Sequence, residues 1–362
     1  MHVLMVTARY PPFVGGTESH VADVSQRLTG MGTKVTVLTT SPGVSLVDER
    51  NEEGVTVVRV PARHLWNDVY FARLLTKHVS TCNPDLVHVQ GYHTFVAPMA
   101  MWAARRAGIP YVVTFHSGGH DSRLRRMVRP AQRRWLRRWL TGAERLIAVS
   151  NFERKSFERS FHLAPGSIAV IPTGVADAFI EVDRPPPADL PSLISIGRLV
   201  DYKGHHLVIE ALADVRRSLP GTRLRVIGNG GDRAALKALA ARLGLSEAVD
   251  FSYVPAADRA GLARELAASS VAVFMSSYES QGIAGYEAVA TGARVVIGSG
   301  TALDELECYP GVELVDRDDR HALSRALVRQ LSEPPLLSRP ALPSTLTTAA
   351  RLEALYRDVL AV

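Results

Sequence analysis

The chain has 362 residues, 46% of them hydrophobic and 22% charged, and carries a formal net charge of +6. A chain of this length predicts two globular domains, each able to bury its own core. No apolar run reaches the roughly 18 residues of a membrane-spanning helix, and the start of the chain lacks the features of a signal peptide. Two distant cysteines, Cys82 and Cys308, match no disulfide or zinc motif. We therefore expect a cytoplasmic protein in a reducing compartment.

The first half of the chain alternates short apolar runs with segments of helical period, which predicts βα units and a parallel sheet. Helices are expected between most of the strands, for example at 18–31 and 95–107. The expected strands are 3–7, 34–38, 55–60, 86–89, 111–115, 145–149 and 168–171. In doubly wound sheets ligands bind at the carboxyl ends of strands, so motifs that directly follow strands are the strongest functional candidates.

Three consecutive prolines at 185–187 interrupt this rhythm and predict a stiff, extended connector. The second half then repeats the pattern, with a last helix expected at 348–360. Its expected strands are 193–196, 224–227, 249–252, 271–275, 294–297 and 313–315, and its expected helices are 204–219, 232–243, 259–268, 283–291 and 320–331. We therefore predict an α/β protein with an N-terminal domain at 1–182, a second domain at 183–345 and a C-terminal helix at 346–362.

Paired glycines, Gly15 and Gly16, follow the first strand and precede a helix. Glycine lets backbone N–H groups approach a ligand closely, and the start of the helix adds its positive end. This arrangement suits a diphosphate or a sugar. The alternative interpretation is an ordinary strand-to-helix turn.

A second motif, Gly-Arg-Leu-Val-Asp-Tyr-Lys-Gly at 197–204, follows the first strand of the second half and opens a helix. Arg198 and Lys203 could neutralise a diphosphate and stabilise the charge that builds up on a leaving group. The alternative is a pair of solvated cations. The helix dipole disfavours cations at that end, however, which favours the functional interpretation.

A third motif follows the strand at 271–275 and contains two carboxylates eight residues apart, Glu279 and Glu287. Gly282 permits a tight turn, so the amides of Gln281, Gly282 and Ile283 can form an anion cradle at the helix start. Glu279 could accept hydrogen bonds from sugar hydroxyls, and Glu287 could bind a ribose diol. The alternative is a capping carboxylate and a surface glutamate.

Polar side chains also follow two strands of the first half. His116 ends the strand at 111–115 and is a candidate for contact with the sugar or the acceptor, although a lone histidine is more often structural. Tyr92 and His93, after the strand at 86–89, are acceptor-side candidates, as is Asp121 in the loop after His116.

Two further motifs are weaker. Asp316-Arg317-Asp318 has the form of a metal-binding D-x-D, but it lies just before a helix, where aspartate is a good N-cap. We therefore predict no metal site. The loop Gly228-Asn229-Gly230-Gly231 resembles a dinucleotide loop, but Arg233 replaces its last glycine, so we interpret it as a loop near the nucleotide.

Residues 123–138 contain eight arginines and no acid, so the excess positive charge belongs to this segment. Steps of four residues predict one apolar stripe on a basic helix interrupted by Pro130. The stripe consists of Leu124, Val128, Trp135 and Trp139. Such a helix could lie on anionic lipid or attract an acidic acceptor, but we favour packing of the stripe on the sheet, with the arginines in water. Without a companion motif, we expect no nucleic-acid partner.

Together the motifs resemble glycosyltransferase family 4. Glu279 and Glu287 are similar to that family's E-x7-E signature, with Gly282 and Ala288 in place, and the 197–204 motif and the Pro-Pro…Gly-Gly loop at 11–16 match as well. So do Ala148-Val149-Ser150 and Ile171-Pro172-Thr173-Gly174-Val175. The five boxes occur in family order over almost the whole chain. One departure is Gln281, where the family usually has an aromatic residue.

The resemblance implies the GT-B fold, two Rossmann-like domains facing a cleft, with the last helix packing back on the first domain. It implies that Arg198 and Lys203 bind the donor diphosphate, that Glu287 holds the ribose and that Glu279 holds the transferred sugar. Gly16 would meet the diphosphate from the opposite domain, and His116 would face the sugar or the acceptor. The family is retaining and generally needs no metal. Front-face attack, with a donor phosphate oxygen taking the proton, is its usual mechanism.

We therefore expect a retaining transferase that moves a hexosyl unit from a nucleotide-diphosphate sugar, a co-substrate and not a cofactor, to a hydroxyl acceptor. A UDP-sugar is the first expectation and a GDP-sugar the second. The acceptor would be a small molecule or a lipid-linked glycan, and residues 123–139 could contact the inner membrane face. The alternatives are a sugar-nucleotide epimerase of the same fold and a non-catalytic protein that binds a membrane surface or nucleic acid.

Overall fold

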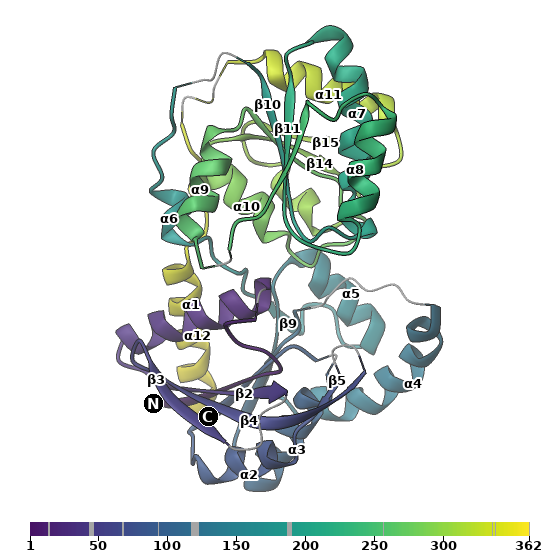
Figure 1. The fold of residues 1–362 in the computed structure, drawn as a ribbon. Coiled ribbons are helices and arrows are strands. Elements are labelled where there is room, and N and C mark those ends of the chain that lie inside the picture. Colours follow the sequence, from purple (N-terminus) through teal and green to yellow (C-terminus); the bar gives the residue numbers. More distant parts are fainter. Residues whose placement is uncertain are drawn as a thin grey trace. The chain divides into compact units, whose positions relative to one another are not determined.

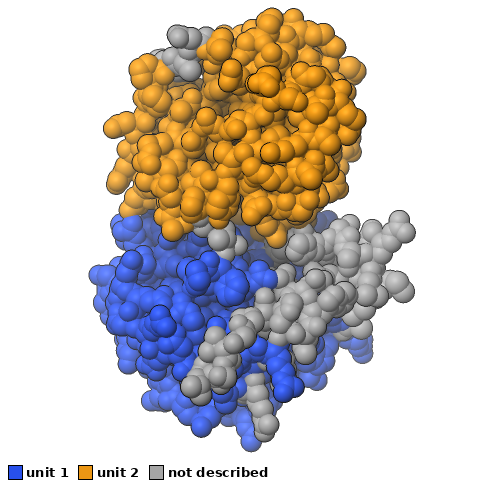
Figure 2. Space-filling view, in the orientation of Figure 1, with its two compact units in different colours: residues 1–174, 343–362 blue, residues 175–342 orange. Residues whose placement is uncertain are grey.

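The computed structural model describes residues 1–13, 15–42, 47–66, 69–92, 94–116, 123–186, 190–255, 257–334, 336 and 338–361. The chain forms two compact units, one of residues 1–174 and 343–362 and the other of residues 175–342 (Figure 2). Residues 175–182 group with the second unit, whereas the sequence placed them in the first domain. The assignment of functional domains to 1–182, 183–345 and the helix 346–362 stays a prediction.

The first unit is built on a sheet whose strands run in the order β3-β4-β2-β1-β6-β7-β8-β9, with β5 paired to β4 (Figure 1). Seven of these strands pair in parallel: β1 His2–Thr7, β2 Lys34–Pro42, β4 Val55–Trp66, β6 Leu86–Gln90, β7 Tyr111–Thr114, β8 Arg145–Ala148 and β9 Ile168–Val170. They confirm the seven strands expected from the sequence.

Two antiparallel strands were not predicted, β3 Asp48–Glu52 and β5 Val69–Phe71. The β3 sequence is entirely polar and its side chains are largely exposed, so it carries no apolar alternation by which a strand could be recognised. It lies at the edge of the sheet, where a polar strand loses nothing by facing water on both sides.

Helices cover both faces of the first sheet. They are α1 Gly16–Gly30, α2 Arg73–Thr81, α3 Val96–Ala107, α4 Arg123–Leu140, α5 Asn151–Phe161 and α12 Thr345–Leu360. The C-terminal helix α12 lies in this unit beside α1, where Leu352 and Tyr356 join the apolar core on one face of the sheet. A Cβ on Gly174 would lie 2.2 Å from the Ser344 carbonyl oxygen, so only glycine fits where the chain returns to this unit.

The arginine-rich helix α4 corrects two expectations. It runs without a break through Pro130. Among its described side chains, Leu136 and Leu140 are buried, Trp139 is partly buried against the core as predicted, and Trp135 is 40% exposed. The predicted stripe is thus wrong for Trp135 and omitted Leu136 and Leu140, which also repeat every four residues and lie in the same core as Trp139. The side chains of Leu124 and Val128 lie outside the described part.

The second unit contains a six-stranded parallel sheet in the order β12-β11-β10-β13-β14-β15 (Figure 1). Its strands are β10 Ser192–Ile196, β11 Arg223–Ile227, β12 Val249–Ser252, β13 Val271–Phe274, β14 Arg294–Gly298 and β15 Val312–Val315, and all six confirm the sequence prediction. Helical segments are α6 Asp177–Ile180, η1 Asp201–Lys203, α7 His205–Ser218, α8 Arg233–Arg242, α9 Arg259–Ala268, α10 Ile283–Ala290, η2 Ala302–Leu306 and α11 Arg320–Ser332.

None of the helices within the described residues is both long enough and apolar enough to span a membrane.

Candidate functional site

The loops after β10 and β11 pack together at the carboxyl edge of the second sheet. A Cβ on Gly228 would lie 1.9 Å from the Gly197 carbonyl oxygen, and one on Gly230 would lie 2.2 Å from that of Leu199. The Leu199 amide donates to the Asn229 carbonyl at 2.9 Å. The Gly228–Gly231 loop therefore supports the Gly-Arg-Leu loop, and its glycines allow this close backbone approach.

Arg198 and Lys203 both contact one aromatic ring. The Arg198 guanidinium donates to the Tyr202 hydroxyl at 2.5 Å and lies 5.8 Å from the ring centroid, while Lys203 Nζ lies 5.6 Å from it. Arg198 is exposed and Lys203 is half-buried. Both cations thus lie against the ring of Tyr202 in the η1 turn, and cation–π attraction helps to hold them there. Their role toward a diphosphate stays a prediction.

Glu279 joins this cluster from the loop after β13. Its Oε1 accepts from Lys203 Nζ at 2.5 Å and from the Ser276 hydroxyl at 2.7 Å. The two charged side chains are only 18% and 15% exposed. A pair so shielded from water interacts more strongly than a surface pair. The structure therefore brings Lys203 together with Glu279, which lies 76 residues later in the chain.

Backbone contacts fix the loop of Glu279 against η1. The Ser277 amide donates to the Tyr202 carbonyl at 2.8 Å. Gly204, with φ of 72°, has no room for a side chain, because a Cβ would lie 2.1 Å from the Met275 carbonyl oxygen. Glycine at 204 therefore serves both a left-handed backbone and a close approach of two loops.

The start of α10, like that of α7, has a glycine with positive φ at a point of close packing. Gly282 is its N-cap with φ of 77° and makes no side-chain capping hydrogen bond. A Cβ there would lie 2.3 Å from Leu303 Cδ2. The side chain of Gln281 is buried. The helix start thus has the glycine geometry expected of an anion cradle, with Ile283 as the first helical residue.

Glu287 lies on α10 and is nearly fully buried, but it does not stand alone. Its Oε1 accepts from Arg259 Nη2 at 2.8 Å, and the Arg259 guanidinium lies 4.9 Å from the centroid of the buried Phe179 ring. A buried carboxylate needs such a partner to remain charged. Arg259 was not singled out in the sequence, where nothing distinguishes it from the other helical arginines.

Another unpredicted residue is His205, which follows Gly204 and begins α7. Its Nδ1 lies 2.9 Å from the Ser195 hydroxyl, and its Nε2 lies 3.2 Å from the Arg198 carbonyl oxygen. Burial lowers the pKa of His205 to about 4, so the ring is neutral near pH 7. The histidine thus fixes the backbone of Arg198 without adding a charge.

In the first unit, the glycine pair begins α1 as expected. Gly15 is the N-cap and Gly16 the first helical residue. The Glu18 carboxylate folds back over Gly15, since a Cβ there would lie 2.2 Å from Glu18 Oε2. The preceding loop is anchored by Arg59, which donates to the Pro11 carbonyl at 2.9 Å. A ligand at this helix start would therefore meet Glu18 as well as the amides.

His116 has φ of 44° and is almost fully buried. Its Nε2 lies 2.8 Å from Gln90 Oε1, and its ring makes an edge contact with that of His20 at 5.0 Å. A left-handed backbone is uncommon for histidine and is a frequent feature of functional sites. Gln90 is the last residue of β6 and pairs with Thr114, the last residue of the neighbouring β7. This pairing brings Gln90 close to His116, which lies two residues after Thr114.

Among the acceptor-side candidates, Tyr92 lies in an aromatic cluster. Its ring makes edge contacts with Phe115, Phe157 and Phe161 at 5.7, 4.9 and 6.0 Å. These contacts give Tyr92 a packing role, and its role toward an acceptor stays a prediction. His93 and Asp121 lie outside the described residues.

We expected the D-x-D motif at 316–318 to cap a helix, but it does not. The N-cap of α11 is the next residue, Asp319, whose side chain accepts from the Ala322 amide. Asp316 instead accepts from the Asp318 amide at 3.0 Å. Within the described part of the chain, no three His, Cys, Asp or Glu side chains are grouped in a way that could hold a metal ion.

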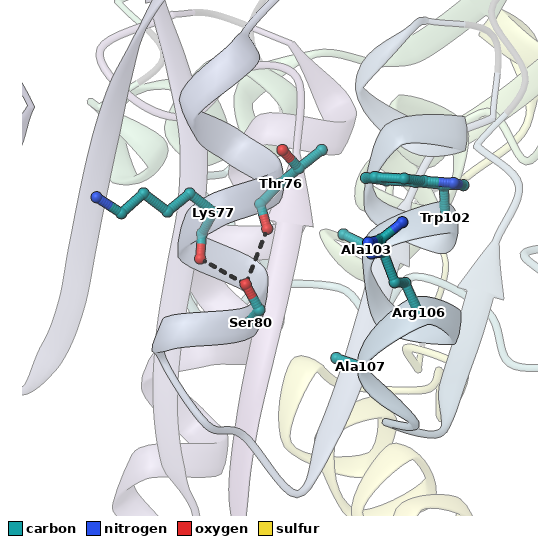
Figure 3. Close-up of a pocket in the computed structure, with 7 residues that line it drawn as sticks. All are labelled: Thr76, Lys77, Ser80, Trp102, Ala103, Arg106 and Ala107. Atoms are coloured by element: carbon teal, nitrogen blue, oxygen red, sulfur yellow. Dashed lines mark hydrogen bonds between the residues drawn. The ribbon is translucent and has the colours of Figure 1, made fainter.

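A cavity of about 350 Å³ lies elsewhere, between α2 and α3 of the first unit (Figure 3). Lys77 and Ser80 line it from α2, and Trp102 and Arg106 line it from α3. None of the predicted site residues belongs to this lining. Because the Arg106 guanidinium lies 5.5 Å from the Trp102 ring centroid, the cavity is bordered by a cation–π pair and not by the carboxyl ends of strands.

Known structures share this fold. Sucrose-phosphate synthase from Thermosynechococcus elongatus superimposes with a TM-score of 0.78 at 21% identity over 99% of both chains. Anabaena Alr3699/HepE, solved in complex with UDP and glucose, gives a TM-score of 0.72 at 19% identity and covers 98% of this chain and 94% of that one. The protein thus has the two parallel-sheet domains of the GT-B glycosyltransferases.

Sequence comparisons define the family. The family model "Glycosyltransferase Family 4" matches residues 14–179, and "Glycosyl transferases group 1" matches residues 178–341. Glycogen synthase of Mycobacterium tuberculosis is 29% identical over 94% of this chain and 88% of that protein. The GDP-mannose-dependent alpha-(1-6)-phosphatidylinositol monomannoside mannosyltransferase of Mycolicibacterium smegmatis is 28% identical over 92% and 90%. The chain belongs to the family 4 glycosyltransferases and is a glycosyl-transferring enzyme.

Proposed function

We propose that this enzyme moves a hexosyl unit from a UDP-sugar to a hydroxyl acceptor with retention at the anomeric carbon. The observation that carries the proposal is the cluster of Arg198, Lys203 and Glu279, in which two cations and a carboxylate converge from loops after β10 and β13. A diphosphate needs fixed cations, and a sugar needs a hydrogen-bond acceptor, so the cluster offers both in one place.

In the proposed reaction the bond from the anomeric carbon to the donor phosphate oxygen breaks, and a bond to the acceptor oxygen forms on the same face. The acceptor proton passes to the departing phosphate oxygen. Arg198 and Lys203 would stabilise the negative charge that grows on the leaving diphosphate, which is where fixed charges contribute most to rate. No protein nucleophile and no metal ion take part in this scheme.

The other members of the site have matching roles. Glu279 would bind hydroxyls of the transferred sugar and Glu287 those of the ribose, while the amides of Gln281, Gly282 and Ile283 would contact phosphate oxygens. In the first unit, Gly15 and Gly16 would supply further amides, and His116 would face the sugar or acceptor. Tyr92, His93 and Asp121 are proposed for the acceptor side, which a small molecule or a lipid-linked glycan would occupy.

The names of similar proteins include both UDP and GDP-mannose, so a donor screen is the first test. Purified protein would be titrated with UDP-, GDP-, ADP- and dTDP-sugars in the presence of EDTA, with melting temperature and donor hydrolysis as readouts. We expect one nucleotide, UDP, to stabilise the protein. Stabilisation by GDP alone would mean that the donor is a GDP-sugar and not a UDP-sugar. A response only after metal addition would overturn the metal-independent scheme.

Lys203→Met provides the matched variant for this screen. Loss of a charge-assisted contact to phosphate should weaken donor binding about 10- to 100-fold. Lys237→Met, which removes an exposed lysine of α8 in the same unit, should bind donor as the wild type does. If Lys203→Met kept full donor affinity, the proposed diphosphate site would be wrong.

Product analysis separates the rival functions. A transferase with retention gives a product with the anomeric configuration of the donor, which NMR coupling constants report. An epimerase would convert the donor itself without any acceptor. A protein that binds nucleotide with neither outcome would be a binding module.

We also propose that α4 contacts anionic lipid. Arg134, Arg138 and Trp135 are exposed on α4, and Trp102 is exposed on the neighbouring α3. Each cation near an anionic membrane contributes about 1 kcal/mol to binding, and tryptophan favours the interface.

Sedimentation with vesicles tests this contact. Binding should require anionic lipid, weaken with salt and fall in an Arg134→Gln/Arg138→Gln variant. Equal binding to neutral and anionic vesicles, or none to either, would contradict it. Arg217→Gln, which alters an exposed arginine of the second unit, is the control.

A further inference from the structure

A chain of buried polar side chains in the first unit leads from the C-terminal helix to His116. The Tyr356 hydroxyl of α12 lies 2.5 Å from His88 Nδ1, and His88 Nε2 lies 2.7 Å from the Thr114 hydroxyl. Gln90 lies two residues after His88 on the same face of β6, and its Oε1 lies 2.8 Å from His116 Nε2. All of these side chains are buried, so their hydrogen bonds do not compete with water.

The surroundings of Gln90 decide which way its amide points. The amide nitrogen lies 3.4 Å from Met5 Sδ and 3.3 Å from both ring nitrogens of His88. The Met5 sulfur can only accept a hydrogen bond. Both ring nitrogens of His88 already contact hydroxyls, those of Tyr356 and Thr114, so His88 has no N–H left to donate to a carbonyl oxygen of Gln90. The NH2 group therefore belongs on this side, and Oε1 faces His116. A carbonyl oxygen can only accept, so His116 Nε2 must carry the proton.

We propose that Gln90 is a positioning residue that holds His116 in the tautomer protonated at Nε2, which makes Nδ1 the acceptor nitrogen of the ring. The inference rests on the proposed role of His116 at the sugar or acceptor. In this tautomer the ring presents an acceptor, and not a donor, at Nδ1. His88, tied to α12 through Tyr356, keeps the Gln90 amide in the required orientation.

Two substitutions at Gln90 separate tautomer control from simple packing. Gln90→Met has a similar volume but no acceptor for Nε2–H, whereas Gln90→Glu keeps an oxygen acceptor at this position. Thr39→Val is the matched control, because the Thr39 hydroxyl is buried in the same unit and has no hydrogen-bond partner among the residues that the structure describes.

The direct readout is the pair of 15N shifts of the His116 ring in the full-length protein, assigned by the signals that His116→Gln removes. We expect wild type and Thr39→Val to show the Nε2-protonated tautomer and Gln90→Met to lose it, while Gln90→Glu keeps Nε2 protonated and favours a second proton on the ring. With the donor found in the screen, kcat of Gln90→Met should fall about 10- to 100-fold, a range typical when the partner that orients a functional histidine is removed, while KM for the donor changes little.

The outcomes distinguish this inference from the proposed function. An Nδ1-protonated wild-type ring, or an unchanged tautomer in Gln90→Met, would overturn the inference even in an active enzyme. A tautomer change in Gln90→Met together with no turnover of any nucleotide-sugar by the wild type would support the positioning of His116 and contradict the transferase mechanism instead. If Gln90→Met failed to fold, the wild-type tautomer would still test the inference, because a ring protonated at Nε2 supports it and one protonated at Nδ1 overturns it.

Discussion

At the scale of single residues, the second unit holds two carboxylates in different ways. Glu279 is bound by a lysine and a hydroxyl from loops beside it, whereas Glu287 is bound by an arginine from a neighbouring helix. Both carboxylates thus have fixed orientations before any ligand arrives. Such preorganisation is what an active site needs to stabilise a transition state.

Glu279→Gln should lower kcat/KM by about 10- to 100-fold, because it keeps the shape of the side chain and removes the charge-assisted hydrogen bonds proposed to hold hydroxyls of the transferred sugar. Steady-state kinetics with the identified donor measures this. Glu313→Gln is the matched control, since Glu313 also forms an ion pair in this unit, with Arg329. Equal losses in the two variants would indicate a stability effect and contradict the assigned role.

Arg259→Met should raise the donor KM with kcat nearly unchanged, because Glu287 would lose its partner and its orientation toward the ribose. The unpaired buried carboxylate should also reduce the free energy of unfolding by about 1–3 kcal/mol, after allowance for the 28% exposure of Arg259. Kinetics and thermal unfolding test both effects. Arg264→Met, on the same helix but exposed, should change neither, and an unaltered KM in Arg259→Met would argue against a ribose contact by Glu287.

At the scale of elements, glycines set how closely the loops of the second unit approach one another. Gly204 joins the loop after β10 to the end of β13, Gly228 joins two loops after adjacent strands, and Gly282 seats α10 against η2. Each contact is between backbone and backbone or between backbone and a core leucine. The geometry of Lys203 and Glu279 depends on these contacts, because a shift of one loop would separate the ion pair.

Gly204→Ala should be clearly more destabilising than Gly244→Ala. Both glycines have positive φ, 72° and 69°, so both substitutions incur about 1–2 kcal/mol of backbone strain. At Gly244 the new methyl group meets nothing within 4 Å, whereas at Gly204 it would collide with the Met275 carbonyl. Calorimetric melting temperatures and donor affinity would be compared. Similar melting temperatures for the two variants would show that the loops can separate without cost.

At the scale of the whole molecule, two buried histidines, His20 and His88, couple the stability of the first unit to pH. Burial lowers the pKa of His20 to about 4 and that of His88 to about 3. Their folded pKa values lie below the ordinary value near 6.5, so the unfolded chain binds protons first as the pH falls. The associated stability is present above about pH 6.5 and is lost as the pH falls toward 4.

The free energy of unfolding of the first unit should therefore fall by about 4 kcal/mol between about pH 7 and pH 5. Tryptophan fluorescence reports this unit alone, because all four tryptophans, at positions 66, 102, 135 and 139, belong to it. Denaturant titrations at several pH values provide the measurement. His20→Phe should flatten the dependence of the unfolding free energy on pH, whereas substitution of the more accessible His78 by Gln should not. A wild-type denaturation midpoint that does not change with pH would refute the prediction.

The sequence alone determined the alternation of strands and helices, all thirteen parallel strands and the main motifs of the site. These features are local, because a buried strand or a glycine turn is recorded within a few consecutive residues. The same locality explains why the polar strand β3 was missed and why Trp135 of α4, and not Leu136 and Leu140, was predicted to face the core. In both cases the neighbouring residues say little about which side faces the core.

Only the tertiary structure decided which side chains meet. Arg259 reaches Glu287 from another helix, and Tyr356 reaches His88 from 268 residues away. Gln90 acquires its link to His116 from the pairing of β6 with β7. A hydrogen bond between distant residues depends on the packing of every element between them, and one-dimensional patterns do not contain that packing. The candidate chemistry could therefore be predicted from the chain, while the partners that hold it in place could not.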